Sequence, residues 1–143
     1  DFGAFLDLLP RKEAGLPLRH AVEVRNPSFI DPDFIALARS KDVAVVYAEH
    51  FEYPEIADVT SGFVYARLQK GDDAIETAYP AGALDKWAER AKLWSNGGTP
   101  DDLPLAAPEQ KADSKPRDVF IYFIHEGKVR APQAAQALAQ RIQ

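Results

Sequence analysis

The stretch that decides the fold lies at residues 62–69 and reads GFVYARLQ. Its side chains alternate between two kinds, as the two-residue period of a β-strand requires. One face is purely apolar and carries Val64, Ala66 and Leu68. The other face begins apolar and turns polar toward its C-terminal end, in the order Phe63, Tyr65, Arg67, Gln69. Strands of a doubly wound open sheet bury both faces and read as nearly continuous apolar runs. A barrel strand turns one apolar face to the helices and its other face to the barrel interior, which becomes polar at the C-terminal rim. This pattern therefore favours a barrel.

Three further segments are predicted to be strands, because they are short, β-branched or aromatic, and followed by turn or helix-start residues. They are His20–Arg25 (HAVEVR), Val43–His50 (VAVVYAEH) and Asp118–His125 (DVFIYFIH). In the first of them, Ala21, Glu23 and Arg25 share one face.

Helical patterns separate the strands. Asp31 before Pro32 is a typical helix start, and apolar residues at three/four spacing predict further helices over Ala83–Ser95 and Ala131–Ile142. Phe2–Leu9 resembles the end of a preceding helix, and Asn96–Pro116 reads as a long solvated surface loop. Strands alternating with helices indicate parallel strands joined by right-handed crossovers. We therefore expect an α/β chain of four units, the C-terminal half of a TIM-barrel-like (β/α)8 domain.

Composition narrows the class of protein. The 143 residues are 46% hydrophobic and 27% charged, with a formal net charge of −5, which is typical of one globular domain that repels nucleic acid on average. No apolar run is long enough for a membrane span, and the absence of cysteine excludes disulfides and thiolate chemistry. We expect a cytoplasmic protein. The chain also lacks methionine and starts at Asp1 inside a helix-like stretch, so we expect the N-terminal half of the barrel to be missing from it.

Four motifs, in the right order, carry a resemblance to a known family. They are VEVRNPSF at 22–29, VYARLQKG at 64–71, Tyr79 followed by Leu84 and Trp87-Ala88, and Val119–Phe123 followed by APQA at 131–134. Together they resemble the YecE-like proteins (domain of unknown function 72). The resemblance implies a TIM-like barrel of about 250 residues and no established activity. The chain departs from the family pattern at two places: Gln69-Lys70 replaces a histidine before glycine, and Ile124-His125 replaces paired asparagines.

The inward polar residues of the predicted barrel are the candidate site. Glu23 is a candidate acid/base or ligand, and Arg25 and Arg67 are candidate clamps for phosphate or carboxylate, because guanidinium binds such groups in bidentate fashion. Tyr65 should face the same cavity, and Gln69 and Lys70 complete the predicted substrate-binding set. The alternatives are a buried ion pair that only fills the barrel, with Arg67 paired to Glu23 or to Glu49.

Strand ends supply the remaining candidates. Glu49 and His125 are predicted catalytic residues, because carboxylates and histidines at adjacent strand ends can form a metal site or an acid/base pair. His50 neighbours Glu49, so strand alternation turns at most one of the two inward. His20 begins its strand and is expected to be structural. We assign no metal ligands, and the sequence leaves any cofactor unknown.

We expect an uncharacterised barrel protein whose mouth binds or acts on a small anionic ligand; whether it is an enzyme stays open. The alternatives are a nucleic-acid-binding or nuclease-like barrel, which the acidic composition disfavours, and a non-catalytic binding scaffold. The expected partners are the small anion and a covering partner, either the N-terminal half of the barrel or another chain, because His20–Arg25 and Asp118–His125 would otherwise be bare edges. No membrane partner is expected. Trp87 should be buried against the outer faces of the third and fourth strands.

Overall fold

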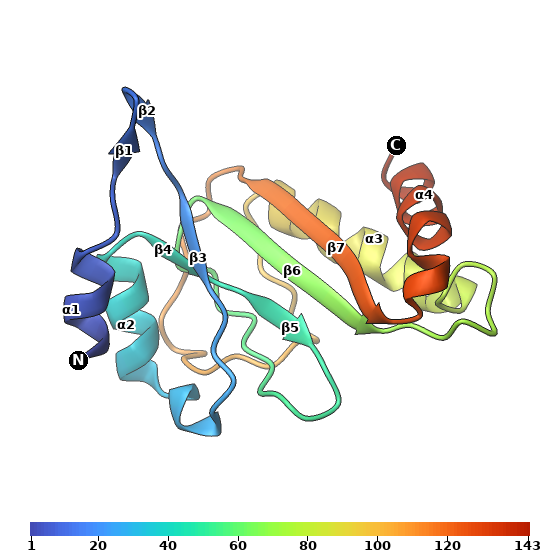
Figure 1. Ribbon diagram of the computed structural model, residues 1–143, viewed down its shortest axis with the longest axis horizontal. Coiled ribbons are helices and arrows are strands. Elements are labelled where there is room, and N and C mark those ends of the chain that lie inside the picture. The colour runs from blue at the N-terminus through green and yellow to red at the C-terminus, as the bar shows by residue number, and fades with distance from the viewer.

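The computed structural model describes residues 1–143 apart from the side chain of His125. It is a mixed α/β structure in which the elements follow one another in the order α1, β1–β3, α2, β4–β6, α3, β7, α4 (Figure 1). The strands are β1 (Lys12–Glu13), β2 (Leu16–Pro17), β3 (His20–Val22), β4 (Val43–Val45), β5 (Tyr47–Glu49), β6 (Phe63–Lys70) and β7 (Asp118–Glu126). The helices are α1 (Phe2–Asp7), α2 (Pro32–Ser40), α3 (Ala81–Ser95) and α4 (Ala131–Ile142), with 3-10 turns η1 (Pro27–Phe29) and η2 (Lys128–Arg130).

All pairings among β3 to β7 are parallel, as the alternation of strands and helices predicts. β3 pairs with β4, while β5, β6 and β7 pair in that order. β4 and β5 follow each other in the chain with only Val46 between them, and the Val46 amide still donates to the Val22 carbonyl at 2.8 Å. The strand predicted over Val43–His50 thus changes its partner at Val46, from β3 to β6. Within the described residues the strands do not close into a barrel, and β3 and β7 each pair on one side only.

Local sequence signals set the helix ends. The Asp31 side chain accepts a hydrogen bond from the Asp33 amide at 2.9 Å, and Pro32 occupies the first turn of α2, as predicted. α3 and α4 lie side by side behind β6 and β7, and α1 and α2 lie together at the other end of the sheet (Figure 1). No helix of the described chain is long and apolar enough to cross a membrane.

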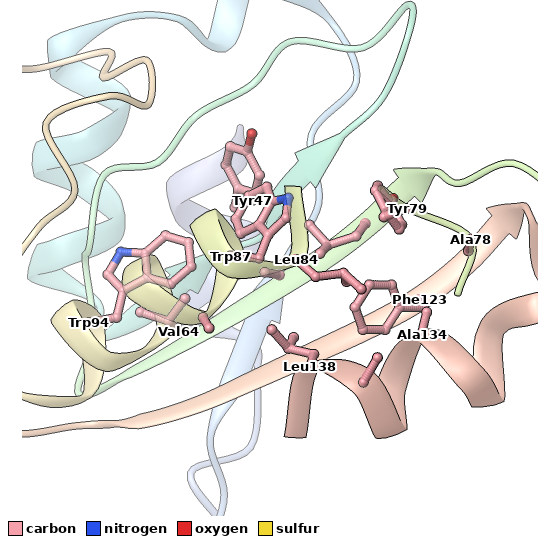
Figure 2. Packing of buried hydrophobic residues seen from close by; sticks show 14 of the residues in the cluster. Tyr47, Val64, Ala78, Tyr79, Leu84, Trp87, Trp94, Phe123, Ala134 and Leu138 are labelled. Carbon is pink, nitrogen blue, oxygen red and sulfur yellow. The ribbon is translucent and has the colours of Figure 1, made fainter. Parts of the chain in front are cut away.

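The core has two apolar clusters on the helix side of the sheet. The larger joins β5, β6 and β7 to α3 and α4, with Trp87, Trp94 and Leu84 at its centre (Figure 2). Trp87 is only 3% exposed and belongs to the cluster that includes residues of the third and fourth predicted strands, β6 and β7. Its ring centroid also lies 5.6 Å from that of Tyr47 on β5, in the second predicted strand. The smaller cluster joins α2 to β3 and β4 and includes Ala106 and Ala107.

Residues 96–116 contain no helix or strand, but they are not uniformly solvated. Ala106 and Ala107 are buried, and their amides donate to the two carboxylate oxygens of Asp58 at 2.7 and 3.0 Å. Asp58 is itself 6% exposed, so these two bonds satisfy a buried charge. The segment is therefore anchored in its middle and closes the smaller cluster.

Two local features differ from the expectation. β3 ends at Val22, so that Glu23 and Arg25 follow the strand instead of belonging to it. β1 and β2 form a short antiparallel hairpin that was not predicted, and both turn residues, Ala14 and Gly15, have positive φ. That geometry is the type I′ turn, which matches the twist of a hairpin.

Candidate functional site

A cavity of about 440 Å³ lies on the sheet face that the helices leave uncovered, which we call the open face. The residues that line it come from β3 and the residues next to it, from Val46 and from β6, and they provide guanidinium, carboxylate and aromatic groups. The lining residues are Arg19, Ala21, Glu23, Val46, Phe63, Tyr65 and Arg67. Strand alternation explains the set, because Phe63, Tyr65 and Arg67 point to the side opposite the apolar core of Val64, Ala66 and Leu68.

Glu23 connects two arginines at this cavity. One carboxylate oxygen, Oε2, accepts from Nε and Nη2 of Arg25 at 3.2 and 3.1 Å. The other oxygen, Oε1, accepts from Nη1 of Arg67 on β6. The Glu23 and Arg67 side chains are 16% and 26% exposed, whereas that of Arg25 is 59% exposed. Two guanidinium groups therefore share one carboxylate, and the trio carries one net positive charge.

Arg25 is also held from its other side by the segment that follows β5. The Arg25 guanidinium lies over the ring of Tyr53, 4.7 Å from its centroid, and Nη1 donates to the Tyr53 hydroxyl at 3.4 Å. The Tyr53 ring stacks in turn on the imidazole of His50, with centroids 3.9 Å apart and planes 10° apart. Nδ1 of His50 accepts from the backbone amides of Glu52 and Tyr53, at 3.0 and 3.3 Å.

Aromatic rings form the rest of the open face. Tyr65 stacks on Tyr122 of β7 with centroids 5.0 Å apart. Nearer the N-terminal ends of the strands, the guanidinium of Arg19 lies over the rings of Phe63 and Phe120, at 5.0 and 5.3 Å, and binds Asp118 at 2.9 Å. Through these contacts Arg19 covers part of the open face at the N-terminal ends of β6 and β7.

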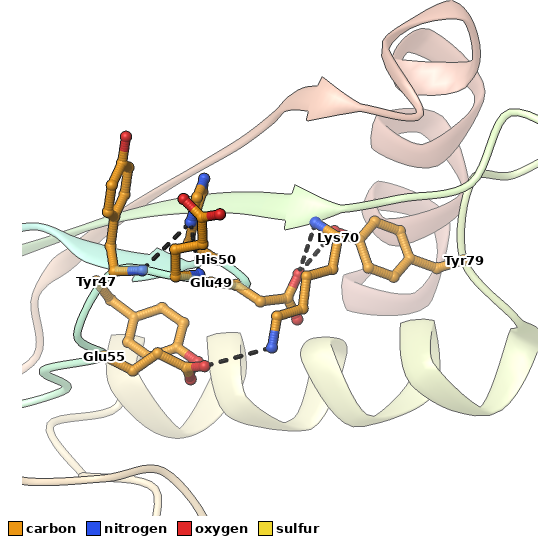
Figure 3. A network of polar contacts seen from close by, with 8 residues as sticks. Tyr47, Glu49, His50, Glu55, Lys70 and Tyr79 are labelled. Atoms are coloured by element: carbon orange, nitrogen blue, oxygen red, sulfur yellow. Dashed lines mark hydrogen bonds and ion pairs between the residues drawn. The ribbon is translucent and has the colours of Figure 1, made fainter.

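A second polar group occupies the helix side of the sheet at the C-terminal ends of β5 and β6 (Figure 3). Glu49 accepts from the Tyr79 hydroxyl at 2.7 Å, and that hydroxyl accepts from the Lys70 amide at 3.0 Å. Glu55 accepts from the Tyr47 hydroxyl at 2.5 Å and from Nζ of Lys70 at 3.5 Å. We call these five residues the helix-side network. Burial, together with the neighbouring carboxylates Glu55 and Glu49, raises the pKa of the Tyr47 and Tyr79 hydroxyls far above the usual range.

The structure thus brings some predicted site residues together and separates others. Glu23, Arg67 and Tyr65 line the cavity of the open face, and Arg25 joins them through its ion pair with Glu23. Arg67 pairs with Glu23, as one of the two alternatives foresaw. Glu49 and Lys70 lie on the helix side instead, because they share strand parity with Tyr47 and Leu68. Glu49 and Lys70 therefore lie on the opposite side of the sheet from Glu23 and Arg67.

Two predicted residues need separate mention. Gln69 is 3% exposed, and its Nε2 has no hydrogen-bond partner within the part of the chain that is described. The side chain of His125, a predicted catalytic residue, lies outside the described atoms. His20 hydrogen-bonds through Nε2 to the Pro10 carbonyl oxygen at 2.6 Å, a contact between backbone and side chain that suits the expected structural role.

Sequence reasoning missed Arg19 and Tyr53. Extending the alternation of Ala21, Glu23 and Arg25 backward by one step places Arg19 on the same face, so a signal for it existed. Tyr53 lies in an irregular segment, where no periodicity reports which neighbour a side chain meets. Among the described residues, no group of three or more histidine, aspartate or glutamate side chains could hold a metal ion.

Comparisons with known proteins agree with this fold. A DUF72 family protein from Enterococcus faecalis V583 aligns with a TM-score of 0.57 and 16% identity, over 87% of this chain and 47% of that one. A DUF72 family protein from Thermotoga maritima MSB8 aligns with a TM-score of 0.56 and 16% identity, over 89% of this chain and 46% of that one. The chain thus spans about half the length of these solved structures, and at such identity the likeness concerns the fold alone.

A search of curated proteins finds no significant match. The family model described as "Protein of unknown function DUF72" matches residues 1–143, the whole of the sequence. The match agrees with the resemblance carried by the four sequence motifs and with the family of the two solved structures. The chain belongs to the DUF72 family.

Proposed function

We propose that the open face binds a small anion, a phosphate- or carboxylate-bearing molecule, between Arg25 and Arg67. The observation that carries this proposal is the sharing of Glu23, which lines the 440 Å³ cavity together with Arg67, by the guanidinium groups of Arg67 and Arg25. A cavity of that size is within the range of small-molecule sites.

The hydrogen-bond inventory supports an anionic ligand. A guanidinium carries five N–H donors, and Glu23 is the only acceptor of Arg67 among the described residues. Most donors of Arg67 are therefore available to a second acceptor. The trio's excess positive charge stands in a chain of net charge −5, and this contrast would draw an anion to this face. Glu23 holds both arginines in place, because each of its carboxylate oxygens accepts from one of them.

We further propose that the sheet is four strands of a (β/α)8 barrel, with this site at its mouth. Three observations support the arrangement: the strands are parallel, β3 and β7 each have one unpaired side, and the chain spans about half of the solved structures it resembles. In a barrel, further strands would pair with both free edges, and Glu23 and Arg67 would lie near the C-terminal rim, where TIM-barrel sites lie. Those strands would come from the same protein or from another chain.

Calorimetric titration of the purified protein with inorganic phosphate and with citrate tests the anion site. Arg67→Gln and Arg25→Gln should each weaken binding about 10- to 100-fold, since a hydrogen bond to a charged group is worth about 1.5–3 kcal/mol. Arg141→Gln is the matched control, because Arg141 also pairs with a carboxylate, Asp85, at 2.7 Å, but on the helix side between α4 and α3. This control should bind like the wild type.

Two results would overturn the proposal. One is the absence of binding of either anion to the wild-type protein, and the other is equal binding by all three variants. Tighter binding of a single-stranded DNA than of phosphate, with a steep salt dependence, would favour the nucleic-acid alternative instead.

A further inference from the structure

We infer that residues 50–55 form a strap that positions Arg25 for the anion, with Tyr53 as the contact and the helix-side network as the anchor. The inference rests on the proposed anion site and adds residues to it that do not touch the ligand. It also gives a role to the predicted residue Lys70 and to His50, which the anion site leaves unused.

The first step concerns Arg25 itself. Its side chain is 59% exposed and follows the end of β3, so neither strand pairing nor core packing fixes it. A free arginine loses considerable rotamer freedom when it is immobilised by a ligand. Tyr53 limits that freedom beforehand, because its ring lies 4.7 Å from the guanidinium while Glu23 binds the guanidinium edge. Arg25 is thereby held between a ring and a carboxylate, with donors left for a ligand.

The second step is the N-terminal fastening of the strap. His50 directly follows β5, and its Nδ1 accepts the amides of Glu52 and Tyr53, which forms a tight turn. The imidazole also stacks on the face of the Tyr53 ring at 3.9 Å. The Tyr53 ring thus contacts the imidazole of His50 as well as the guanidinium of Arg25, and the stacking on His50 restricts its orientation.

The third step is the C-terminal fastening. Glu55 ends the strap and lies on the helix side of the sheet, where Tyr47 donates to it at 2.5 Å and Lys70 at 3.5 Å (Figure 3). The Tyr47 ring is 3% exposed and packs on Trp87, so its hydroxyl is a rigid donor. Through Glu55, the core on one side of the sheet fixes the segment that carries Tyr53 to the other side.

Tyr53→Leu and Tyr53→Phe separate positioning from general structure. Leucine removes the ring, so we expect the phosphate affinity to fall about three- to tenfold, the range of a cation–π contact plus the lost ordering of Arg25. Phenylalanine keeps the ring and loses only the long 3.4 Å hydrogen bond, so its affinity should stay within about twofold of wild type.

A double-mutant cycle tests the anchor. Glu55→Gln should weaken phosphate binding in the wild-type background and have no further effect in the Tyr53→Leu background, because both act through the same contact. The control is Asp85→Asn, which breaks an ion pair with Arg141 away from the strap and should leave the affinity unchanged. Thermal melts identify any variant that has unfolded, and Tyr53→Met replaces Tyr53→Leu if the leucine variant does not fold.

The outcomes distinguish this inference from the proposed function. If the wild type binds no anion, the proposed function and the strap both fail. If Arg25→Gln weakens binding while Tyr53→Leu does not, the anion site stands and the strap is refuted. Equal losses in Tyr53→Leu and Tyr53→Phe would also refute it, because the stacked ring would not be what matters.

Discussion

Replacing Trp87 with alanine should destabilise the protein by about 3–5 kcal/mol. Trp87 is 97% removed from solvent and contacts the rings of Tyr47 and Trp94, while the Arg90 guanidinium covers its outer face at 4.4 Å. A buried aromatic side chain removes about 200 Å² from water. At about 25 cal/mol per Å², this burial corresponds to about 5 kcal/mol of unfolding free energy. Neighbouring side chains that relax into the cavity recover part of it, so the expected loss is about 3–5 kcal/mol, the range for buried aromatics.

Urea unfolding followed by far-ultraviolet circular dichroism is the assay, because the substitution removes one of only two tryptophans that fluorescence would report. With a slope of about 2 kcal/mol per molar urea, the midpoint should fall by roughly 2 M. If the alanine variant does not fold, Trp87→Phe gives the same test with a smaller loss. Glu89→Ala on the same helix is the control, since its side chain is 73% exposed and its loss should stay within about 0.5 kcal/mol. A loss below 1 kcal/mol for Trp87→Ala would mean that α3 presents a different face to the sheet.

Two more predictions concern buried polar groups. The pKa values of the Tyr47 and Tyr79 hydroxyls are raised in the folded protein, so the free energy of unfolding should be unchanged below about pH 10, where the unfolded phenols keep their protons, and should fall as the pH rises further. Absorbance at 295 nm should show that two of the five tyrosines ionise only on unfolding. Ionisation of these two tyrosines in the folded protein would contradict their burial. Gln69→Leu should raise the unfolding free energy by about 1–3 kcal/mol, because the buried Nε2 has no partner in the described structure; a lower thermal midpoint would show that the amide has an acceptor after all.

The regular elements could be predicted because their signals are local. The Asp31-Pro32 pair gave the start of α2, and the alternation at 62–69 gave the two faces of β6 and thereby the side on which Arg67 lies. Strand alternation also places Glu49 with Tyr47 on the helix side. The period of a strand therefore already implied that Glu49 and Glu23 lie on opposite sides of the sheet.

The remaining features depend on contacts that a periodic pattern does not encode. The run Val43–His50 is continuously apolar until Glu49, so nothing in it marks the change of partner at Val46. Tyr53 meets Arg25, which lies 28 positions earlier in the chain, and both residues stand in irregular backbone just beyond a strand. The hairpin at 12–17 was overlooked because its strands have two residues each, too few for any period to appear.

The bond between Asp58 and the amides of Ala106 and Ala107 has a consequence for how the molecule forms. It spans 48 and 49 positions of sequence, and it completes the small cluster built on α2, β3 and β4. Contacts so distant along the chain require the closure of a long loop and slow the folding of a domain. During synthesis, α2 and its strands emerge from the ribosome well before residue 107, and they must wait for that residue before their apolar side is covered. The segment that carries β3, α2 and β4 is therefore the part that chaperones would encounter unprotected, although it is made before the residues that cover it.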